Sequence, residues 1–341
     1  MHLLIRGCGA LGVFVAMRAA RSGLAATLMA DDAFEAERLT HALQGLTDIE
    51  IRTEQQGLPQ DVNAALAPPA VLPDVPLRFA LAAPGGPIPD GAAAVHIHKT
   101  LAEVSLAKMC LANRQQVLSL LECLALPVME VPDGATCFAG LALLDRLAAL
   151  ADHCLLLGAV PWEVDSAMEA FGFETGVFAA QDAAGLDLSY ARRQAGAAAP
   201  LLVTDRMVRE GRLGRGAGVG WYRYPGGGGA VIDPLMEDMA VEEARFASIA
   251  QRAVPDEEVM IRLLLGLACR GAELLSDGNI ADAAQLHMLC QLVLGYPEER
   301  GGILAWVQSM GHDTASGRLT EFSDGGSALW PPQALLEQLV K

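Results

Sequence analysis

The chain begins MHLLIRGCGALGVFVAMRAARSGLAATLMADD (residues 1–32), and the expected fold follows from this stretch. A short apolar run at 2–6 leads into a glycine-rich turn, and a helical apolar pattern then covers 10–22. Residues 25–30 predict a second strand, which Asp31 and Asp32 close. A strand, a glycine-rich turn, a helix and a second strand together predict the first βαβ unit of a parallel sheet.

The turn has the spacing Gly7-x-Gly9-x-x-Gly12, which in this context is typical of a dinucleotide site. The first glycine allows a tight turn, the second lets the backbone approach a pyrophosphate, and the third lets the helix pack on the strand. The helix N-terminus offers free amides to the phosphates. A purely structural tight turn is the alternative. We expect the cofactor to be NAD and its binding residues to be Gly7, Gly9, Ala10, Leu11, Gly12 and Asp31.

Asp31 stands where an acidic residue would bind the ribose hydroxyls, although it lies one residue later than usual. A carboxylate there favours NAD over NADP because it would repel a 2′-phosphate. Arg6 departs from the motif, since a small or apolar residue is usual at the end of the first strand.

Strands and helices continue to alternate as far as about residue 134, after which the pattern is almost wholly helical. Short apolar runs at 77–84, 92–99 and 127–131 predict strands, and 112–124 predicts a helix, whereas 46–75 shows no clear period. We expect an α/β domain over 1–134 and helical domains over 135–226 and 235–325. The two helical blocks share a layout, which suggests an internal duplication of about 100 residues.

Composition narrows the function classes. The chain has 341 residues, 52% of them hydrophobic, and a net charge of −17, which disfavours binding to nucleic acid through bulk charge. Its seven cysteines include no Cys-x-x-Cys pair, so we expect reduced thiols, a cytoplasmic location and no metal site. No run approaches the roughly 18–20 uncharged apolar residues of a membrane helix, so we expect no membrane insertion.

Two segments carry a resemblance to a known family. FGFETGVFAAQDAAGLDLSYARR (171–193) and DRMVREGRLGRGAGVGWYRY (205–224) closely resemble the C-terminal domain of 3-hydroxyacyl-CoA dehydrogenases. LGYPEERGGILAWVQSMG (294–311) resembles the second copy of that domain in the α-subunit of bacterial fatty-acid oxidation complexes. The resemblance implies a shortened Rossmann-like domain followed by two helical domains of this type, NAD as cofactor and an acyl-CoA substrate.

The resemblance also bears on assembly. Single-copy members of the family dimerise through the helical domain. We therefore expect residues 136–224 to pack against 238–312 as an internal pseudo-dimer, and a partner subunit of a β-oxidation complex is a further possibility.

In this family a histidine takes the proton of the 3-hydroxyl group while hydride passes to NAD, and a glutamate orients the imidazole. VHIHKTLAEV (95–104) is the candidate segment, and the resemblance assigns Glu103 as the glutamate and His96 as the base. His98 is a rival, because strand alternation puts both imidazoles on one face. The loop between histidine and glutamate is shorter than the family's.

Further departures leave three functions open. Phe138 matches the family, but Leu141 replaces an active-site asparagine, and the family's substrate-binding serine segment has no counterpart. The leading hypothesis is an NAD-dependent 3-hydroxyacyl-CoA dehydrogenase, or a near relative that acts on an unusual acyl group. The alternatives are a catalytically degenerate scaffold or subunit of an acyl-CoA-metabolising complex, and a CoA-thioester binder without redox chemistry.

Overall fold

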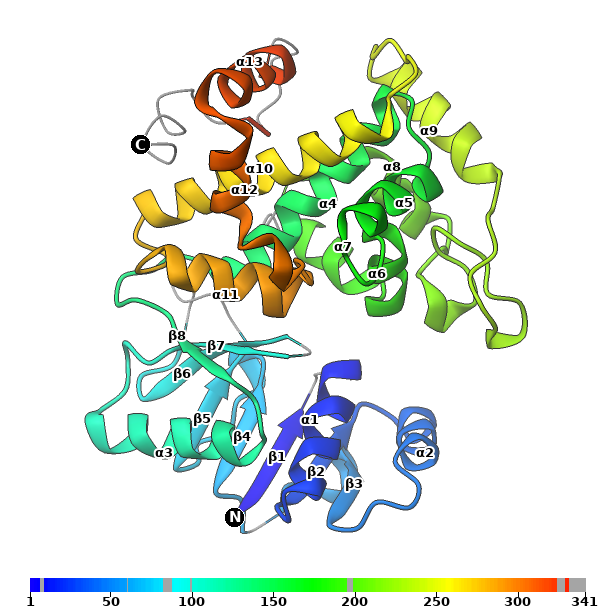
Figure 1. Ribbon diagram of the computed structural model, residues 1–341. Helices are drawn as coiled ribbons and strands as arrows, with labels where there is room; N and C mark the ends of the chain where they lie inside the picture. The colour runs from blue at the N-terminus through cyan, green and yellow to red at the C-terminus, as the bar shows by residue number, and fades with distance from the viewer. Residues whose placement is uncertain are drawn as a thin grey trace. The chain divides into compact units, whose positions relative to one another are not determined.

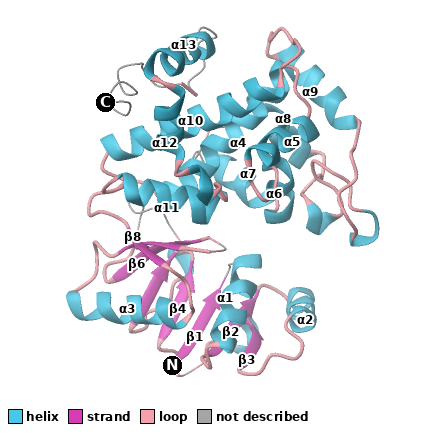
Figure 2. Cartoon of the chain, viewed as in Figure 1, coloured by secondary structure: helices cyan, strands magenta, loops and turns pink. Residues whose placement is uncertain are grey.

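The structure is a computed structural model that describes residues 1–6, 9–59, 61–81, 88–98, 100–194, 199–323 and 329–330. The chain forms two compact units, residues 1–141 with 277–281, and residues 142–276 with 282–341. Figure 2 shows strands in the first unit and helices throughout the second. The predicted fold class, a parallel α/β sheet domain followed by helical structure, is confirmed.

The described residues of the first unit form an eight-stranded sheet in the order β3-β2-β1-β4-β5-β6-β7-β8 (Figure 1). Neighbouring strands are parallel, except that β7 is antiparallel to β6. The order reverses direction at β1, which is the switch point where ligands bind in open α/β sheets. The strands are β1 (His2–Arg6), β2 (Ala25–Ala30), β3 (Ile49–Thr53), β4 (Ala64–Ala67), β5 (Leu77–Ala80), β6 (Ala92–Ile97), β7 (Ala102–Ser105) and β8 (Val128–Glu130).

The α-helices that accompany this sheet in the described part of the chain are α1 (Gly9–Arg21), α2 (Ala33–Ala42) and α3 (Leu111–Cys123). α1 packs against β1 and β2, and α3 packs against β5 and β8. The core between them is apolar, with Leu3, Ile5 and Val15 at 2% exposure or less. Burial of these side chains is the main force that holds the layers together.

Two strands, β3 and β4, lie in the stretch where the sequence showed no clear period. In β3, Ile49 and Ile51 pack against the core, while Glu50 and Arg52 form an ion pair with each other. All four residues of β4, AALA, are buried between β1 and β5. Alanine has little preference for strands, so the neighbouring strands, rather than propensity, make β4 extended.

The second unit is built from the rest of α4 and the helices that follow it. α10 packs against α5, and it also meets α4, where a Cβ on Gly266 would lie 2.5 Å from Leu150 Cδ1. The helices are α4 (Ala139–Leu157), α5 (Pro161–Phe171), α6 (Val177–Ala184), α7 (Asp187–Gln194), α8 (Leu202–Arg209), α9 (Leu235–Phe246), α10 (Asp256–Ser276), α11 (Ala283–Leu294), α12 (Ile303–Met310) and α13 (His312–Ser323).

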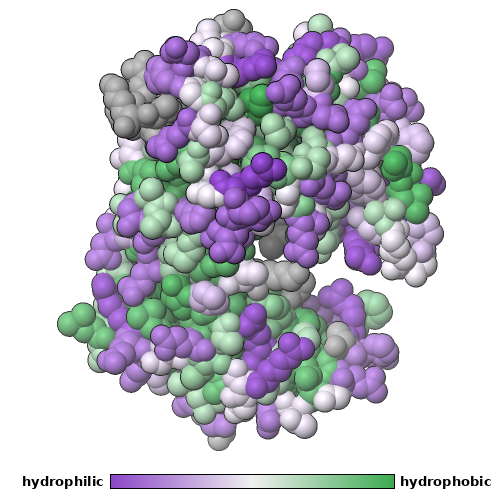
Figure 3. All heavy atoms as spheres, viewed as in Figure 1, coloured by the Kyte–Doolittle hydropathy of each residue, from purple (hydrophilic) through white to green (hydrophobic). Residues whose placement is uncertain are grey.

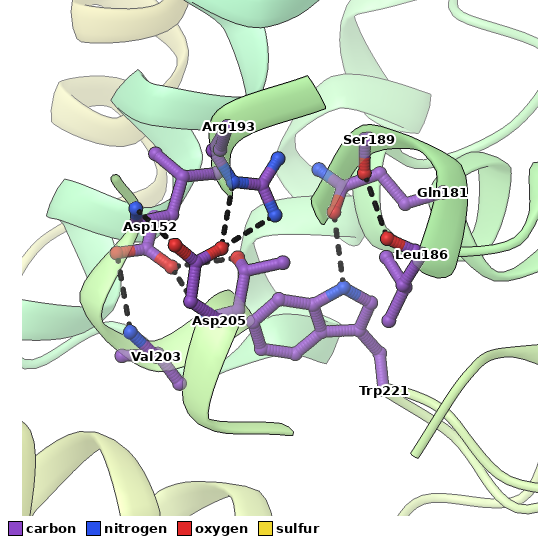
Figure 4. Close-up of polar contacts among 10 residues, drawn as sticks. Asp152, Gln181, Leu186, Ser189, Arg193, Val203, Asp205 and Trp221 are labelled. Atoms are coloured by element: carbon purple, nitrogen blue, oxygen red, sulfur yellow. Dashed lines mark hydrogen bonds and ion pairs between the residues drawn. The ribbon is translucent and has the colours of Figure 1, made fainter. Parts of the chain in front are cut away.

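Several buried polar groups in the helical unit are paired, as Figure 4 shows for one cluster. Arg193 Nε donates to Asp205 Oδ1 at 2.6 Å, and Trp221 Nε1 donates to Gln181 Oε1 at 3.1 Å. Asp152 accepts from the backbone N–H groups of Val203 and Thr204. Such pairing offsets the cost of burying polar groups, so this cluster is part of the packed core.

Hydrophilic side chains are spread over the face shown in Figure 3, with smaller apolar areas between them. Among the helices that the structure describes, none has both the length and the apolar character that crossing a bilayer requires. Within the same residues, no group of three or more His, Cys, Asp or Glu side chains is placed to hold a metal ion.

Candidate active site

The candidate catalytic residues lie on the hairpin formed by β6 and β7. His98 directly follows β6, and its backbone N–H donates to the Leu101 carbonyl at 2.7 Å, which closes the turn. Glu103 lies on β7, directly opposite His96 in the antiparallel register. Side chains of directly opposed residues share one face of a sheet, and so do residues two positions apart. His96, His98 and Glu103 therefore project from the same face.

The carboxylate of Glu103 forms a hydrogen bond with the imidazole of His98. The Nε2 atom of His98 lies 2.7 Å from Oε2 of Glu103. The two side chains are only 5% and 0% exposed, so water does not screen this pair. The contact is diagonal across the hairpin, because the carboxylate reaches toward the turn rather than straight across to the opposed residue.

His96 lies beside this pair. Its ring centroid is 4.5 Å from that of His98, with the rings edge-on at 69°, and 5.9 Å from that of Phe138. His96 is half-buried, whereas His98 is 8% exposed. The assignment of His96 as the base stays a prediction, but the hydrogen bond to Glu103 favours its rival, His98.

The start of α4 completes the surroundings of the carboxylate. Gly140 lies in the first turn of α4, and its backbone N–H donates to Glu103 Oε2 at 3.0 Å. The other oxygen, Oε1, is buried and has no hydrogen-bond partner among the residues described. The polar contacts of Glu103 therefore converge on Oε2, the oxygen that faces the imidazole.

The residues predicted to bind the cofactor lie at the carboxyl ends of β1 and β2. Gly9 is the first residue of α1, and Ala10, Leu11 and Gly12 follow in its first turn, whereas Gly7 lies outside the described residues. Carboxyl ends of parallel strands meet at one edge of a sheet, so this turn shares an edge with Asp31 and His98.

Asp31 and Asp32 differ in what their carboxylates do. Asp31 is exposed, and in the described part of the chain its carboxylate accepts no hydrogen bond. Asp32 instead caps α2, because its Oδ1 accepts the Glu35 N–H at 2.7 Å. Arg6, which ends β1, forms an ion pair with Glu54. Of these two carboxylates, that of Asp31 is therefore the better candidate to bind ribose hydroxyls.

Sequence reasoning missed two residues around the start of α4. Gly140 was not singled out, although glycine is unfavourable inside a helix and its presence there calls for a reason. Asn279 was also missed, since it follows α10 in the sequence and yet belongs to the first compact unit. Its Oδ1 accepts the N–H groups of Thr136 at 2.8 Å and Cys137 at 3.2 Å, which anchors the segment before α4.

Comparison with known families identifies the segment that begins at Phe138. Residues 138–224 match the family described as 3-hydroxyacyl-CoA dehydrogenase, C-terminal domain. This segment is therefore similar to that domain over about a quarter of the chain. The resemblance inferred from the sequence is thereby confirmed, and this dehydrogenase C-terminal domain comprises α4 to α8.

Curated proteins are similar to about half of this chain. The peroxisomal bifunctional enzyme of Danio rerio is 29% identical over 204 residues, covering 54% of this chain and 28% of that protein. The fatty acid oxidation complex subunit alpha of Pseudomonas aeruginosa (strain LESB58) is 28% identical over 189 residues, covering 52% and 26%. The matching part of the chain thus spans little more than a quarter of each of these relatives.

Solved structures show a similar fold along nearly the whole chain. The 3-hydroxybutyryl-CoA dehydrogenase of Escherichia coli K12 aligns with a TM-score of 0.68 and 16% identity, covering 100% of this chain and 98% of that one. The dehydrogenase part of multifunctional enzyme 1 from C. elegans gives a TM-score of 0.62 and 15% identity, covering 98% and 88%. At such identities the likeness shows the fold: a Rossmann-like sheet domain followed by a helical domain.

Proposed function

We propose that this protein oxidises a 3-hydroxyacyl-CoA to a 3-oxoacyl-CoA with NAD, with His98 as the base and Glu103 as the residue that orients it. The observation that carries the proposal is the buried hydrogen bond of 2.7 Å between these two side chains at the edge of the sheet. A base held by an orienting carboxylate is the arrangement that proton abstraction from an alcohol needs. The dehydrogenase C-terminal domain that follows supports the same reaction.

We infer the positions of the protons in this pair from its hydrogen-bond partners. Oε2 of Glu103 lies within hydrogen-bond distance of both the Gly140 N–H and His98 Nε2, so it acts as an acceptor and Nε2 carries the imidazole proton. The lone pair of neutral His98 then belongs to Nδ1, which has no hydrogen bond to the rest of the described chain. His98 Nδ1 takes the proton of the 3-hydroxyl group, and Glu103 offsets the charge of the imidazolium that forms.

The residues present fit NAD. The N-terminus of α1, with Gly9 as its first residue, suits a pyrophosphate. The Asp31 carboxylate accepts no hydrogen bond from the residues that the structure describes, and it suits the two ribose hydroxyls. Asp32 and Glu35 add negative charge at the start of α2, which disfavours the 2′-phosphate of NADP. NAD, when bound, supplies the acceptor for the hydride.

The test compares two histidine variants in an assay with 3-hydroxybutyryl-CoA and longer 3-hydroxyacyl-CoA thioesters. His98→Gln should lower kcat by about 10²–10⁴-fold, because a positioned base contributes that much. His96→Gln is the matched control, because His96 lies two residues before His98 and projects from the same face. It should lower kcat far less. The opposite ranking would assign the base to His96, as the resemblance first implied.

A scaffold without catalysis is the second candidate, and Leu141 favours it. This side chain packs against an apolar cluster that includes Phe138, where the family has a polar active-site residue. A titration with NADH distinguishes the dehydrogenase from the scaffold, with fluorescence transfer from protein to nicotinamide as the signal. The dehydrogenase should bind NADH saturably. A protein that binds neither NADH nor acyl-CoA would be a scaffold, and one that binds only acyl-CoA would be a CoA-thioester binder.

The alpha subunit among the relatives also motivates a proposal on assembly. We propose that the protein works beside a partner enzyme of acyl-CoA oxidation, with the two helical blocks forming an internal pseudo-dimer. The packing of α10 on α4 and α5 supports the second part, because α10 lies in the later block and α4 and α5 in the earlier one.

A further inference from the structure

The first turn of α4 meets the His98–Glu103 pair at a glycine. The Gly140 N–H donates to Glu103 Oε2 at 3.0 Å, and the same oxygen faces His98 Nε2 at 2.7 Å. Two groups, one from α4 and one from the residue after β6, therefore meet at one carboxylate oxygen of β7. Because these elements are separated in sequence, their meeting point depends on how closely the backbone of α4 approaches the hairpin.

That approach leaves no room for a side chain at position 140. A Cβ on Gly140 would lie 2.8 Å from Glu103 Oε2, 2.9 Å from His98 Nε2 and 3.2 Å from His98 Cε1. Contacts shorter than 3.0 Å are not found for real Cβ atoms, so the carboxylate or the imidazole would have to move. Both are almost fully buried, so they have little space into which to move.

We propose that Gly140 is a positioning residue of this pair, an inference that rests on the proposed function. Its N–H fixes the orientation of Oε2, and its missing side chain leaves the space in which imidazole and carboxylate meet. Glycine is unfavourable inside a helix, so its presence here calls for a physical reason, and the contact with the pair supplies one.

The hydrogen-bond inventory of Glu103 strengthens the inference. Oε1 is buried and has no partner in the described part of the chain, so the Gly140 N–H and His98 are the contacts that hold the carboxylate. The positive end of the α4 dipole also favours negative charge at this position. Loss of the Gly140 contact would leave His98 as the remaining anchor of a buried carboxylate.

The experiment compares Gly140→Ala with Gly317→Ala. Both glycines lie in helices, but nothing lies within 4 Å of a Cβ placed on Gly317. Gly140→Ala should lower kcat by about 10²-fold with little change in KM, because a small misplacement near the reacting atoms costs that much. Gly317→Ala should leave kcat unchanged. An unchanged kcat in Gly140→Ala overturns the proposal.

A second readout does not depend on turnover. The His98 Nε2 proton, identified by its absence in His98→Gln, should give a low-field proton NMR signal that persists because the hydrogen bond is buried. Gly140→Ala should shift or abolish this signal, and Gly317→Ala should not. If no variant and no wild-type preparation oxidises any 3-hydroxyacyl-CoA, the proposed function fails, and this signal alone decides the role of Gly140.

A double variant guards against a merely unfolded Gly140→Ala protein. Glu103→Asp withdraws the carboxylate from the added methyl group. The thermal midpoint of the double variant Gly140→Ala/Glu103→Asp should therefore fall by less than the sum of the falls in the two single variants. Additive losses would show that the methyl group and the carboxylate do not compete for the same space, and they would overturn the steric part of the proposal.

Discussion

At the residue scale, two ion pairs of the helical unit differ chiefly in burial. Asp205 and Arg193 are 5% and 4% exposed, whereas Glu242, which pairs with Arg206, is 51% exposed. Asp205→Ala should lower the free energy of unfolding by about 3–5 kcal/mol, because it leaves a buried charge without its partner. Glu242→Ala should cost about 0–1 kcal/mol. Urea denaturation measures both, and equal losses would contradict the prediction.

Asp165 should respond to pH in a direction that its burial sets. Burial raises the pKa of this carboxyl to about 6, although it accepts hydrogen bonds from the Phe178 and Ala179 N–H groups and the Tyr222 hydroxyl. The folded protein therefore holds a proton that the unfolded chain, with an ordinary pKa of about 3.9, releases earlier. The stabilisation is complete below pH about 4 and is lost as pH rises through about 6.

The measurement for Asp165 is a carboxyl ¹³C NMR titration, with the resonance identified by its absence in Asp165→Asn. We expect a midpoint near 6, and between pH 4 and 6 the stability of the wild-type protein should fall relative to that of the variant. A midpoint near 4 would contradict the prediction, since it would mean that hydrogen bonds to the ionised carboxylate outweigh the cost of its burial.

At the scale of elements, the contact between α4 and α10 depends on a glycine. Gly266→Ala would place a methyl carbon 2.5 Å from Leu150 Cδ1, so we expect a loss of about 1–3 kcal/mol in unfolding free energy from overpacking. Gly317→Ala in α13 meets nothing and should gain about 0.4–1 kcal/mol, because alanine restricts the unfolded chain.

Leu150→Ala supplies the matching control for this helix contact. Combined with Gly266→Ala, it removes the side chain that the new methyl group would meet, so the double variant should lose less stability than the sum of the single losses. Independent losses would indicate that α4 and α10 do not pack at this point, and they would weaken the proposed pseudo-dimer of the two helical blocks.

At the scale of the whole molecule, NADH should stabilise the sheet unit selectively. A ligand at about 100 times its Kd raises the free energy of unfolding by about 2.7 kcal/mol. Hydrogen exchange should show this as added protection of backbone amides in β1 and β2, whose carboxyl ends carry the predicted site. Gly9→Val should abolish the protection, because a side chain there would block close approach of the pyrophosphate. Added protection that survives in this variant would contradict the site assignment.

Local patterns in the sequence predicted many of the strands and helices. The run from the first strand through the glycine-rich turn to Asp31 predicted β1, α1 and β2, because hydrophobic period and turn chemistry are encoded within a few neighbouring residues. The apolar helical pattern after residue 135 predicted that the rest of the chain is mainly helical, for the same reason. Resemblance to the family motif singled out Glu103 and left two histidines on one strand face as candidates for the base.

Contacts between distant segments were decided only in the folded chain. β4 is extended because β1 and β5 flank it, and Asn279 anchors Thr136 across 143 positions of sequence. The register puts His96 opposite Glu103, yet the carboxylate reaches diagonally to His98, a choice set by the tight turn and by the N-terminus of α4. The close approach of Gly140 to Glu103 and His98 likewise exists only in the folded chain. A residue's sequence neighbours record its local preference, but the space and the hydrogen-bond donors around its side chain come from elements that only folding brings together.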